Sequence, residues 1–252
     1  MSAAGPNLVL RALAMTALPT RKDEAWRYSD LTAVARLWPV PPATVIDVLA
    51  GENATRHLIA ESGIHDYTIA LGAGSRMDFH VLNAGAGYGR IAIDVTLHDG
   101  AHFEFGAVQI GSGEANLEIV TTVRHIEPNA TSRQTVRSVL GGTATGSYLG
   151  KVAVSREAQK TDSVQSVKAM LLTRTATANA KPELEIYADD VKCAHGCAIG
   201  ELDQQAMFYL ASRGIPPLEA QTLLLRAFVA EVFDGADPAL ETAALDALEN
   251  LS

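Results

Sequence analysis

Cysteine is scarce in this chain of 252 residues, which contains only Cys193 and Cys197. A secreted fold held together by disulfides needs more pairs than this, so the two thiols indicate a reducing compartment, and we expect a cytoplasmic protein. Long apolar runs are missing as well. Because no stretch of 18 apolar residues occurs, we expect no membrane-spanning helix.

The start of the sequence lacks the basic residues that open a secretion signal. The segment from Asn7 to Leu18 is largely apolar, but Arg11 lies in its middle and Pro19 follows it. This pattern predicts a short amphipathic helix and not a leader peptide.

Positive charge is also in short supply, because 20 lysines and arginines stand against 29 acidic residues and the net charge is −9. No basic cluster offsets this balance, so we expect no nucleic-acid partner. The acidity is concentrated after residue 198, where nine acids stand against two arginines. Such an excess is typical of a solvated helical surface, and it also suits docking to a basic partner. The sequence leaves both interpretations open.

Signatures of nucleotide-binding and hydrolytic enzymes are missing too. The sequence contains no Gly-x4-Gly-Lys-Ser/Thr stretch, and the glycine-rich run from Gly85 to Gly89 has neither the lysine nor a following helix pattern. A Gly-x-Ser-x-Gly nucleophile motif is also absent. These absences argue against a P-loop enzyme and an α/β-hydrolase.

What is present divides the chain into a helical segment (1–63), a β-rich core (64–200) and a second helical segment (201–252). In the first segment Thr20 and Asp23 are a plausible cap for a helix from Arg21 to Leu37, which the following prolines end. In the last segment we expect helices at 204–212, after the capping Asp203, at 218–233 and at 238–251.

The middle segment has the pattern of short strands. Thirteen of the 20 glycines lie between residues 72 and 150, and apolar side chains alternate with polar ones at Ile91, Ile93, Val95 and Leu97. No convincing helix pattern separates these runs. The segment is therefore predicted to be mainly β, and the pattern fits a sandwich, a barrel or a β-helix equally well.

The helix predicted for Leu218 to Phe233 has an apolar face wider than a single stripe. One interpretation is that this helix packs against the chain's own sheet and its last helix. The other is that part of the face binds a partner, and the residues that we would assign to that role are Leu218, Leu224, Leu225, Phe228 and Val232.

The densest group of metal-ligating residues is Cys193, His195 and Cys197. If this stretch is extended, all three share one face, with successive Cα atoms about 6.6 Å apart and the two cysteines roughly 13 Å apart, too far for a disulfide. Thiolate and imidazole are ligands for zinc, copper(I) and iron–sulfur species. With no second cysteine pair, a complete site would need ligands from another chain; otherwise the thiols are incidental.

A rival group is His98, His102 and Glu104. In an all-β chain these residues suggest an alternative function, a cupin-like metal-dependent enzyme. The spacing fits poorly, since the first cupin motif requires His-x-His, and Asp99-Gly100 between the histidines is typical of a turn.

One long stretch, from Lys181 to Gly196, closely resembles the signature of SufD, a scaffold subunit of the SUF iron–sulfur cluster assembly system. The sister scaffold SufB would carry His-Glu-Ala where this chain has Ala194-His195-Gly196, so the SufD type fits better. Further stretches that match are Leu18–Tyr28, His125–Ser132, Gly150–Gln159, Asp162–Gln165, Asp203 and Met207–Ile215.

The resemblance implies a right-handed parallel β-helix flanked by N- and C-terminal α-helical segments. It implies a non-catalytic scaffold that pairs with SufB and docks the ATPase SufC. A transient iron–sulfur cluster would lie at the SufB interface, with no cofactor tightly bound to the isolated chain. A homodimer of the isolated chain is a further option.

The resemblance also assigns residues. His195 would serve nascent cluster assembly, with Cys193 as its neighbour. Cys197 stands where a small apolar residue is usual, which makes it a candidate auxiliary ligand. The helix from Leu218 to Phe233 would belong to the SufC-docking element.

Overall fold

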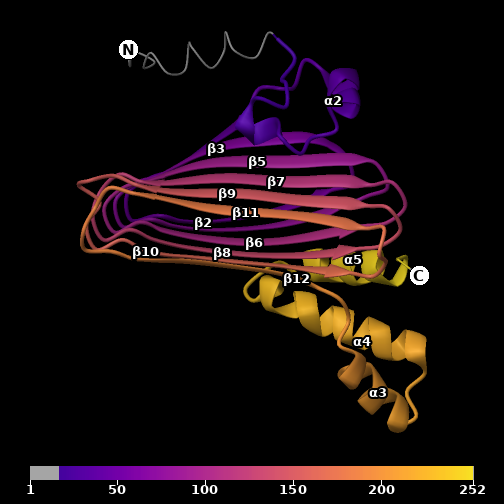
Figure 1. Ribbon diagram of the computed structural model, residues 1–252. Helices are drawn as coiled ribbons and strands as arrows, with labels where there is room; N and C mark the ends of the chain where they lie inside the picture. The colour runs from indigo at the N-terminus through magenta and orange to yellow at the C-terminus, as the bar shows by residue number, and fades with distance from the viewer. Residues whose placement is uncertain (1–16, 252) are drawn as a thin grey trace.

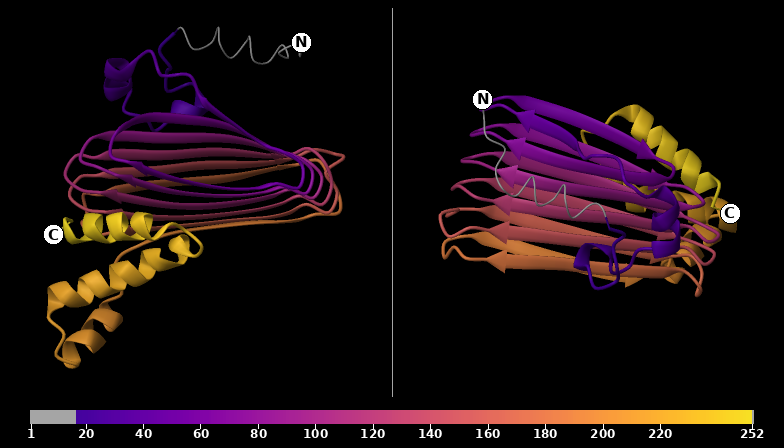
Figure 2. Two further views of the ribbon diagram at one scale, coloured as in Figure 1. Left: turned by 180° about the vertical axis from the view of Figure 1, so that it is seen from behind. Right: turned by 90° about the horizontal axis from the view of Figure 1, so that it is seen from above.

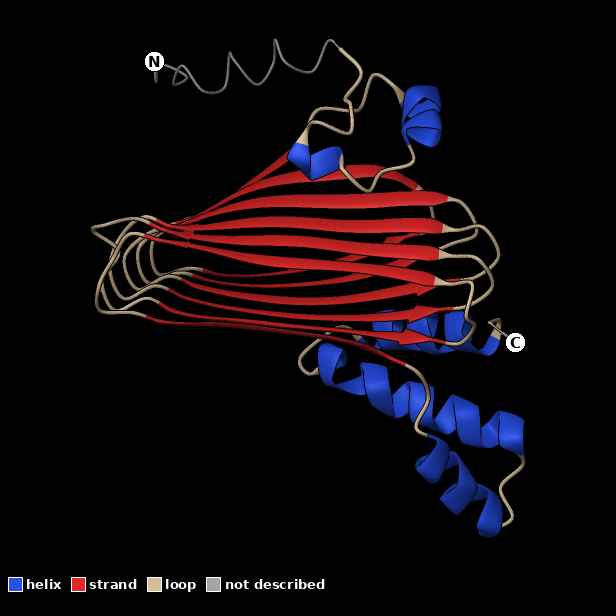
Figure 3. Ribbon diagram, in the orientation of Figure 1, coloured by secondary structure: helices blue, strands red, loops and turns tan. Residues whose placement is uncertain are grey.

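A computed structural model of the protein describes residues 17–251, which form a parallel β-solenoid with helical segments at both ends (Figures 1 and 3). The helix predicted for Asn7 to Leu18 lies outside the described residues except for its last two. The strands are β1 (Thr44–Val48), β2 (Asn53–Ala60), β3 (Gly63–Leu71), β4 (Arg76–Ala84), β5 (Tyr88–Leu97), β6 (His102–Gly111), β7 (Asn116–His125), β8 (Thr131–Leu140), β9 (Thr145–Val154), β10 (Asp162–Leu171), β11 (Thr177–Ile186) and β12 (Lys192–Gly200). None of the helices in residues 17–251 is both long and apolar enough to span a bilayer.

Odd-numbered strands form one parallel sheet, in the order β1-β3-β5-β7-β9-β11, and even-numbered strands form the other, in the order β12-β10-β8-β6-β4-β2. We call them sheet A and sheet B. Each coil of the chain adds one strand to each sheet, and Figure 2 shows the coils stacked from above. The prediction of a mainly β core is confirmed, and the parallel pairing decides between the three architectures that the sequence left open.

The core lies between the two sheets, because alternate side chains of every strand point inward. The predicted alternation in β5 is confirmed, since Ile91, Ile93, Val95 and Leu97 are all buried in one apolar cluster. Stacking brings residues of successive coils into contact in columns, as with Phe79 on β4 and Phe105 on β6, whose rings meet edge to face. Such columns provide the area that stabilises a solenoid, which has no other centre.

The strands begin at Thr44, whereas the sequence analysis placed the start of the β core at residue 64. The reason is that β1 and β2 are the outermost strands of the first coil. Most of their residues are half-buried or exposed, and charged Arg56 occupies the interior register position next to Phe79. A strand that buries little apolar surface leaves little signal in the sequence.

The helix predicted for Arg21 to Leu37 is interrupted in the structure. A single 3-10 turn, η1 (Glu24–Trp26), comes first, and α2 (Leu31–Leu37) begins only after Asp30, whose carboxylate accepts hydrogen bonds from two backbone amides of its first turn. Thr20 and Asp23 do interact, with Thr20 N donating to Asp23 Oδ2 at 2.7 Å, but they close a turn.

This N-terminal segment covers part of the outer face of sheet A. Its apolar contacts join Val34 and Val40 to Ile64 and Tyr88 of the sheet. The segment also covers two charged side chains of sheet A, Arg90 and Glu118.

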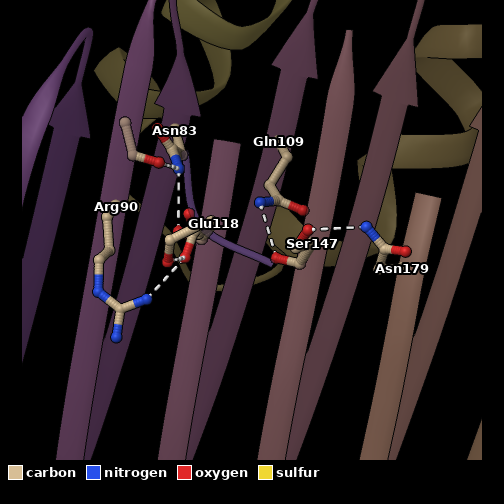
Figure 4. Close-up of polar contacts among 8 residues, drawn as sticks. Asn83, Arg90, Gln109, Glu118, Ser147 and Asn179 are labelled. Atoms are coloured by element: carbon tan, nitrogen blue, oxygen red, sulfur yellow. Dashed lines mark hydrogen bonds and ion pairs between the residues drawn. The ribbon is translucent and has the colours of Figure 1, made fainter. Parts of the chain in front are cut away.

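A buried ion pair lies beneath the N-terminal segment (Figure 4). Arg90 Nη1 on β5 lies 2.7 Å from Glu118 Oε2 on β7, and both side chains are at most 3% exposed. Ser29 donates a hydrogen bond to the same carboxylate oxygen at 2.8 Å, and the Arg90 guanidinium lies 3.9 Å from the centre of the Trp26 ring. The pair therefore depends on the segment that shields it from water.

Figure 4 also shows how buried amides join the two sheets. Asn83 on β4 donates to the backbone oxygens of Gly89 and Glu118, and Gln109 on β6 donates to the Ser147 backbone oxygen. Within sheet A, the half-buried Asn179 on β11 donates to the Ser147 hydroxyl of β9 at 3.1 Å. These bonds satisfy polar groups that would otherwise be costly to bury.

The C-terminal helices are α3 (Gln204–Ser212), α4 (Pro217–Ala230) with the 3-10 turn η2 (Glu231–Phe233), and α5 (Pro238–Glu249). Asp203 caps α3 as predicted, accepting from Gln205 N and Ala206 N. Helices α4 and α5 pack on the outer face of sheet B, against Leu82, Val108, Ile110 and Val139. Helix α3 and the adjoining end of α4 project beyond the last coil (Figures 1 and 2).

Candidate functional site

Strand β12 is the last strand of sheet B and carries Cys193, His195 and Cys197, which we call the rim residues. The stretch is extended, as the shared-face prediction required. In register, the three rim residues pair with Ser163, Gln165 and Val167 of β10. Those three β10 side chains are buried inside the solenoid, so the rim residues face the same interior.

No further coil covers the rim residues within the part of the chain that the structure describes. His195 and Cys197 are exposed and Cys193 is half-buried, although the equivalent positions one coil earlier are at most 3% exposed. The solenoid interior therefore opens to solvent at this end, with two thiols and one imidazole at its edge.

The opposite wall of the opening is apolar. Interior register positions on β11 include Ala180, Pro182 and Leu184, which pair with Tyr148, Gly150 and Val152 of β9. Leu184 and Cys193 belong to the same apolar cluster. Burial there raises the pKa of the Cys193 thiol, against a smaller opposing contribution from a hydrogen bond with the Ser163 backbone. A soft ligand facing an apolar wall is suited to sulfur-rich metal species.

Behind the rim, the interior changes from apolar to polar. One column of sheet B runs Arg56, Phe79, Phe105, Gln134, Gln165, His195, and its neighbour runs Ala54, Met77, Phe103, Ser132, Ser163, Cys193. The first coils are packed with aromatic and aliphatic side chains. The last coils before the rim instead carry buried amides and hydroxyls, each at most 1% exposed.

These polar residues form two hydrogen-bonded groups. In the first, Thr121 and Tyr148 donate to Gln134 Oε1 at 2.7 and 3.1 Å, and Gln165 Nε2 donates to the Tyr148 hydroxyl at 3.2 Å. Burial raises the pKa of Tyr148, so its hydroxyl keeps its proton.

The second group lies behind Cys193. The Ser132 and Ser163 hydroxyls are 2.9 Å apart, and His125 Nε2 lies 3.0 Å from Ser132 Oγ. Burial lowers the pKa of His125 to about 4, so the imidazole is neutral near pH 7.

The sequence analysis missed both groups, although a signal was present. Ser132-x-Gln134 recurs as Ser163-x-Gln165, and Cys193-x-His195 occupies the same place in the next coil. A search for recurrence at the length of one coil would have aligned the three pairs.

The rival metal site is not formed. His98 Nδ1 lies 3.1 Å from Glu127, while His102 binds Thr131 at 2.6 Å and lies 3.3 Å from Glu104. Within residues 17–251, no three His, Cys, Asp or Glu side chains come close enough together to hold a metal ion. Sheets of parallel strands also differ from a cupin barrel. The prediction of a cupin-like enzyme is therefore wrong, because the turn at Asp99-Gly100 separates the two histidines.

The predicted partner-binding residues fall into two groups. Leu225 and Val232 are 2% exposed and pack on sheet B, while Phe228 and Leu224 are half-buried. Leu218 is 59% exposed. Sheet B thus covers the side of the predicted apolar face that contains Leu225 and Val232.

The free side of the helices carries an apolar surface that the sequence analysis did not assign in full. We call it the helical patch, and its members are Phe208, Tyr209, Leu218 and Leu223, which are 76%, 56%, 59% and 49% exposed. Leu218 and Leu223 line one groove, together with Ile215 and Thr222. Exposed apolar side chains of this size are typical of interaction surfaces when they lie side by side.

Arg137 connects these helices to the sheet next to the rim. Its guanidinium, 2% exposed, donates to Ser166 O at 2.9 Å, to Ser166 Oγ at 3.0 Å and to Glu231. The ring of Phe228 lies 6.0 Å from it. Ser166 pairs in register with Gly196 on β12. Arg137 therefore links Glu231, at the end of α4, to β10, the strand next to β12.

Comparison with known proteins shows which family the chain belongs to. The sequence matches the family described as SUF system FeS cluster assembly, SufBD core domain, over residues 43–228. An iron–sulfur cluster assembly SufBD family protein of Synechocystis is 33% identical over 198 residues, 75% of this chain and 44% of the relative. SufD of Escherichia coli is 38% identical over 112 residues (44% and 26%), and SufD of Bacillus subtilis is 29% identical over 134 residues (53% and 31%). The matches span less than half of each of these relatives.

The fold and the site define a parallel β-solenoid protein whose last coil is open and carries thiol and imidazole groups. The family match covers the whole solenoid, from β1 to β12, and the chain belongs to the SufBD family of the SUF system. Within that family it is similar to proteins named SufD, in agreement with the resemblance that the sequence around His195 carries.

Proposed function

We propose that this chain is a non-catalytic scaffold subunit for iron–sulfur cluster assembly. In this role it pairs with a SufB-type sister subunit at the open end of the solenoid and docks a SufC-type ATPase through its C-terminal helices. The growing cluster is cargo held transiently at the sister interface, and the isolated chain holds no cofactor tightly. Two free thiols suit a reducing cytoplasm.

The observation that carries this proposal is the uncovered last coil. Cys193, His195 and Cys197 occupy interior positions and yet meet solvent, so the surface is suited to being covered by another chain. One chain offers too few ligands to close a site around an iron–sulfur cluster, which uses four ligands in most proteins. A second subunit at this end would add ligands and would exclude water in the same step.

The sister subunit would also continue the sheets. Strands β11 and β12 each pair on one side only within the described residues, which leaves rows of backbone donors and acceptors available. A partner with the same coil geometry satisfies these groups by adding strands. A second copy of this chain can use the same edges, so the isolated chain is expected to form a homodimer when the sister is absent.

The ATPase would bind the helical patch, because its four members are exposed and lie away from sheet B. Of the residues first assigned to this role, Leu218 and Leu224 remain at or near the surface. Leu225, Phe228 and Val232 instead fix α4 to the sheet, so their contribution is to hold the docking helix in place.

The test of scaffold function is co-expression with the SufB-type subunit and the SufC-type ATPase, followed by size analysis and measurement of cluster content. We expect a stable ternary complex. His195→Ala should lower cluster delivery while leaving assembly intact, with a smaller loss for Cys193→Ala and the smallest for Cys197→Ala. If complexes containing His195→Ala deliver clusters normally, the role of the rim in assembly is refuted.

The test of ATPase docking compares two exposed apolar surfaces. Leu218→Asp combined with Leu223→Asp should abolish co-purification of the ATPase without lowering thermal stability, because both residues are exposed. The matched control is Val45→Asp, 66% exposed on β1, which should retain the ATPase. Retention by the double variant, with normal folding, would remove the helical patch from the proposal.

A further inference from the structure

Gln165 lies directly behind His195 in the same interior column of sheet B. Its side chain is 1% exposed, and its Nε2 donates a hydrogen bond to the Tyr148 hydroxyl at 3.2 Å. The side-chain oxygen behaves differently. Gln165 Oε1 is buried and has no hydrogen-bond partner among the described residues. A buried amide oxygen without a donor is costly, so its retention requires an explanation.

The amide is also held in orientation. Tyr148, whose hydroxyl accepts from Gln165, is itself held by the hydrogen bond that it donates to Gln134 Oε1. This network fixes the nitrogen end of Gln165 within the chain's own core. The oxygen end is therefore pre-positioned as an acceptor, and it accepts no hydrogen bond from the described residues.

His195 has the complementary need. Its imidazole makes no hydrogen bond within residues 17–251, and it occupies the register position next to Gln165 on the neighbouring strand. Imidazoles that bind metals almost always donate their second N–H to an oxygen acceptor, which fixes the ring's tautomer and orientation. Without such an acceptor, His195 would present either nitrogen to a cluster, in several rotamers.

We propose that Gln165 is the positioning residue for His195: its side-chain oxygen accepts the imidazole N–H and leaves the other ring nitrogen free to face the cluster. The inference deepens the proposed scaffold function and rests on it. Gln165 touches neither iron nor sulfide itself. It acts through His195, and the Tyr148 network acts through Gln165.

Gln134 supplies a competing explanation and also the control. It precedes Gln165 in the column, and its Nε2 is likewise buried without a partner. If the two glutamines simply serve each other as an amide ladder, removing either one should have the same effect. If Gln165 serves His195 directly, removing Gln165 should affect the rim more than removing Gln134, which reaches the rim only through Tyr148.

The experiment uses the full chain in complex with the SufB-type subunit and the SufC-type ATPase, reconstituted with ferrous iron and sulfide. The variants are Gln165→Met, which removes the acceptor, Gln165→Glu, which keeps an oxygen there, Gln134→Met and His195→Ala. Loss of a hydrogen-bond partner behind a metal ligand typically costs about 10–100-fold in metal affinity or activity. We expect that loss in cluster formation for Gln165→Met. The loss should be smaller for Gln134→Met, which acts only through Tyr148, and smaller for Gln165→Glu, which keeps the oxygen but loses the bond from Nε2 to Tyr148.

A second readout separates positioning from a structural effect. In the full chain labelled with 15N-histidine, the ring nitrogen shifts of His195 report its tautomer. A single tautomer is expected in the wild-type complex and a mixture in Gln165→Met, while thermal stability and complex size confirm that each variant folds.

The outcomes divide cleanly. If Gln165→Met forms clusters normally while His195→Ala does not, the positioning role is refuted and the scaffold function stands. An equal loss for Gln134→Met and Gln165→Met, or an unchanged His195 tautomer, refutes it in favour of a core effect. If His195→Ala itself forms clusters normally, the rim assignment fails, and the role of Gln165 fails with it.

Discussion

Replacing Glu118 by leucine should be among the most damaging single changes in this fold. The substitution leaves the Arg90 guanidinium buried without its counterion, and it removes the acceptor of the Ser29 hydroxyl. Both charged side chains are at most 3% exposed, so water cannot compensate while the N-terminal segment stays in place. Breaking a buried pair of this kind costs about 3–5 kcal/mol of unfolding free energy.

The loss of unfolding free energy in Glu118→Leu is limited by how strongly the N-terminal segment binds to sheet A. Trp26 and Ser29 belong to the segment that covers the pair. We expect this segment to detach, with the sheets still folded, once the penalty exceeds what its own contacts contribute. Detachment returns Arg90 to water and relieves the penalty. Above that limit, the effect of Glu118→Leu should therefore appear as faster protease cleavage within residues 39–43 and not as further loss of global stability.

The assay is urea denaturation of the wild type, Glu118→Leu, Arg90→Met and the double variant, with limited proteolysis in parallel. The double variant should recover most of the loss, since an apolar pair of similar volume replaces an ion pair at little cost. A single Glu118→Leu variant that loses less than about 1 kcal/mol, with unchanged proteolysis, would refute the reasoning, because ion pairs worth so little are exposed ones.

Three further predictions follow from buried groups. Burial lowers the pKa of His125 from 6.5 to about 4, so stability is complete above pH 6.5 and falls by about 3 kcal/mol as the pH drops toward 4; His125→Gln should flatten that acid limb in urea titrations, and an unchanged pH profile would contradict the assignment. Gly150→Ala would place its Cβ 2.1 Å from the Tyr148 hydroxyl and should cost about 1–3 kcal/mol in unfolding experiments, whereas an unchanged Tm would mean that the ring has another place to go. Arg137→Met should speed amide exchange in residues 217–233, because Glu231 loses its ion pair with Arg137 of β8; equal exchange would show that apolar packing alone holds α4.

How much of the fold could be predicted depends on which contacts are local. The alternation in β5 and the Asp203 cap are properties of a few neighbouring residues, and both are confirmed. The choice between sandwich, barrel and solenoid depends on which strands pair, and alternating burial is the same in all three. Only the resemblance around His195 indicated the solenoid.

The errors have the same origin. Helix periodicity showed that α4 has a wide apolar face, but it could not show that sheet B occupies the side with Leu225 and Val232. At the rim, the sequence predicted that Cys193 and His195 share a face. It could not predict that this face is an interior one without a coil above it, because that depends on where the stacking of the coils ends.

The interior column that contains Gln165 begins at Arg56 and ends at His195, and these two residues affect whether copies of the chain can stack head to tail. A stack of identical coils has a direction, and addition of one copy's first coil to another's last coil would repeat without limit into a fibre. At the first coil, the column begins with exposed Arg56, at the register position of Phe79. Head-to-tail growth would seat that guanidinium on His195 inside the new core, with no anion beside it in either column. A charge buried in this way opposes filament formation, while two last coils brought together, as in a closed pair, bury no such arginine.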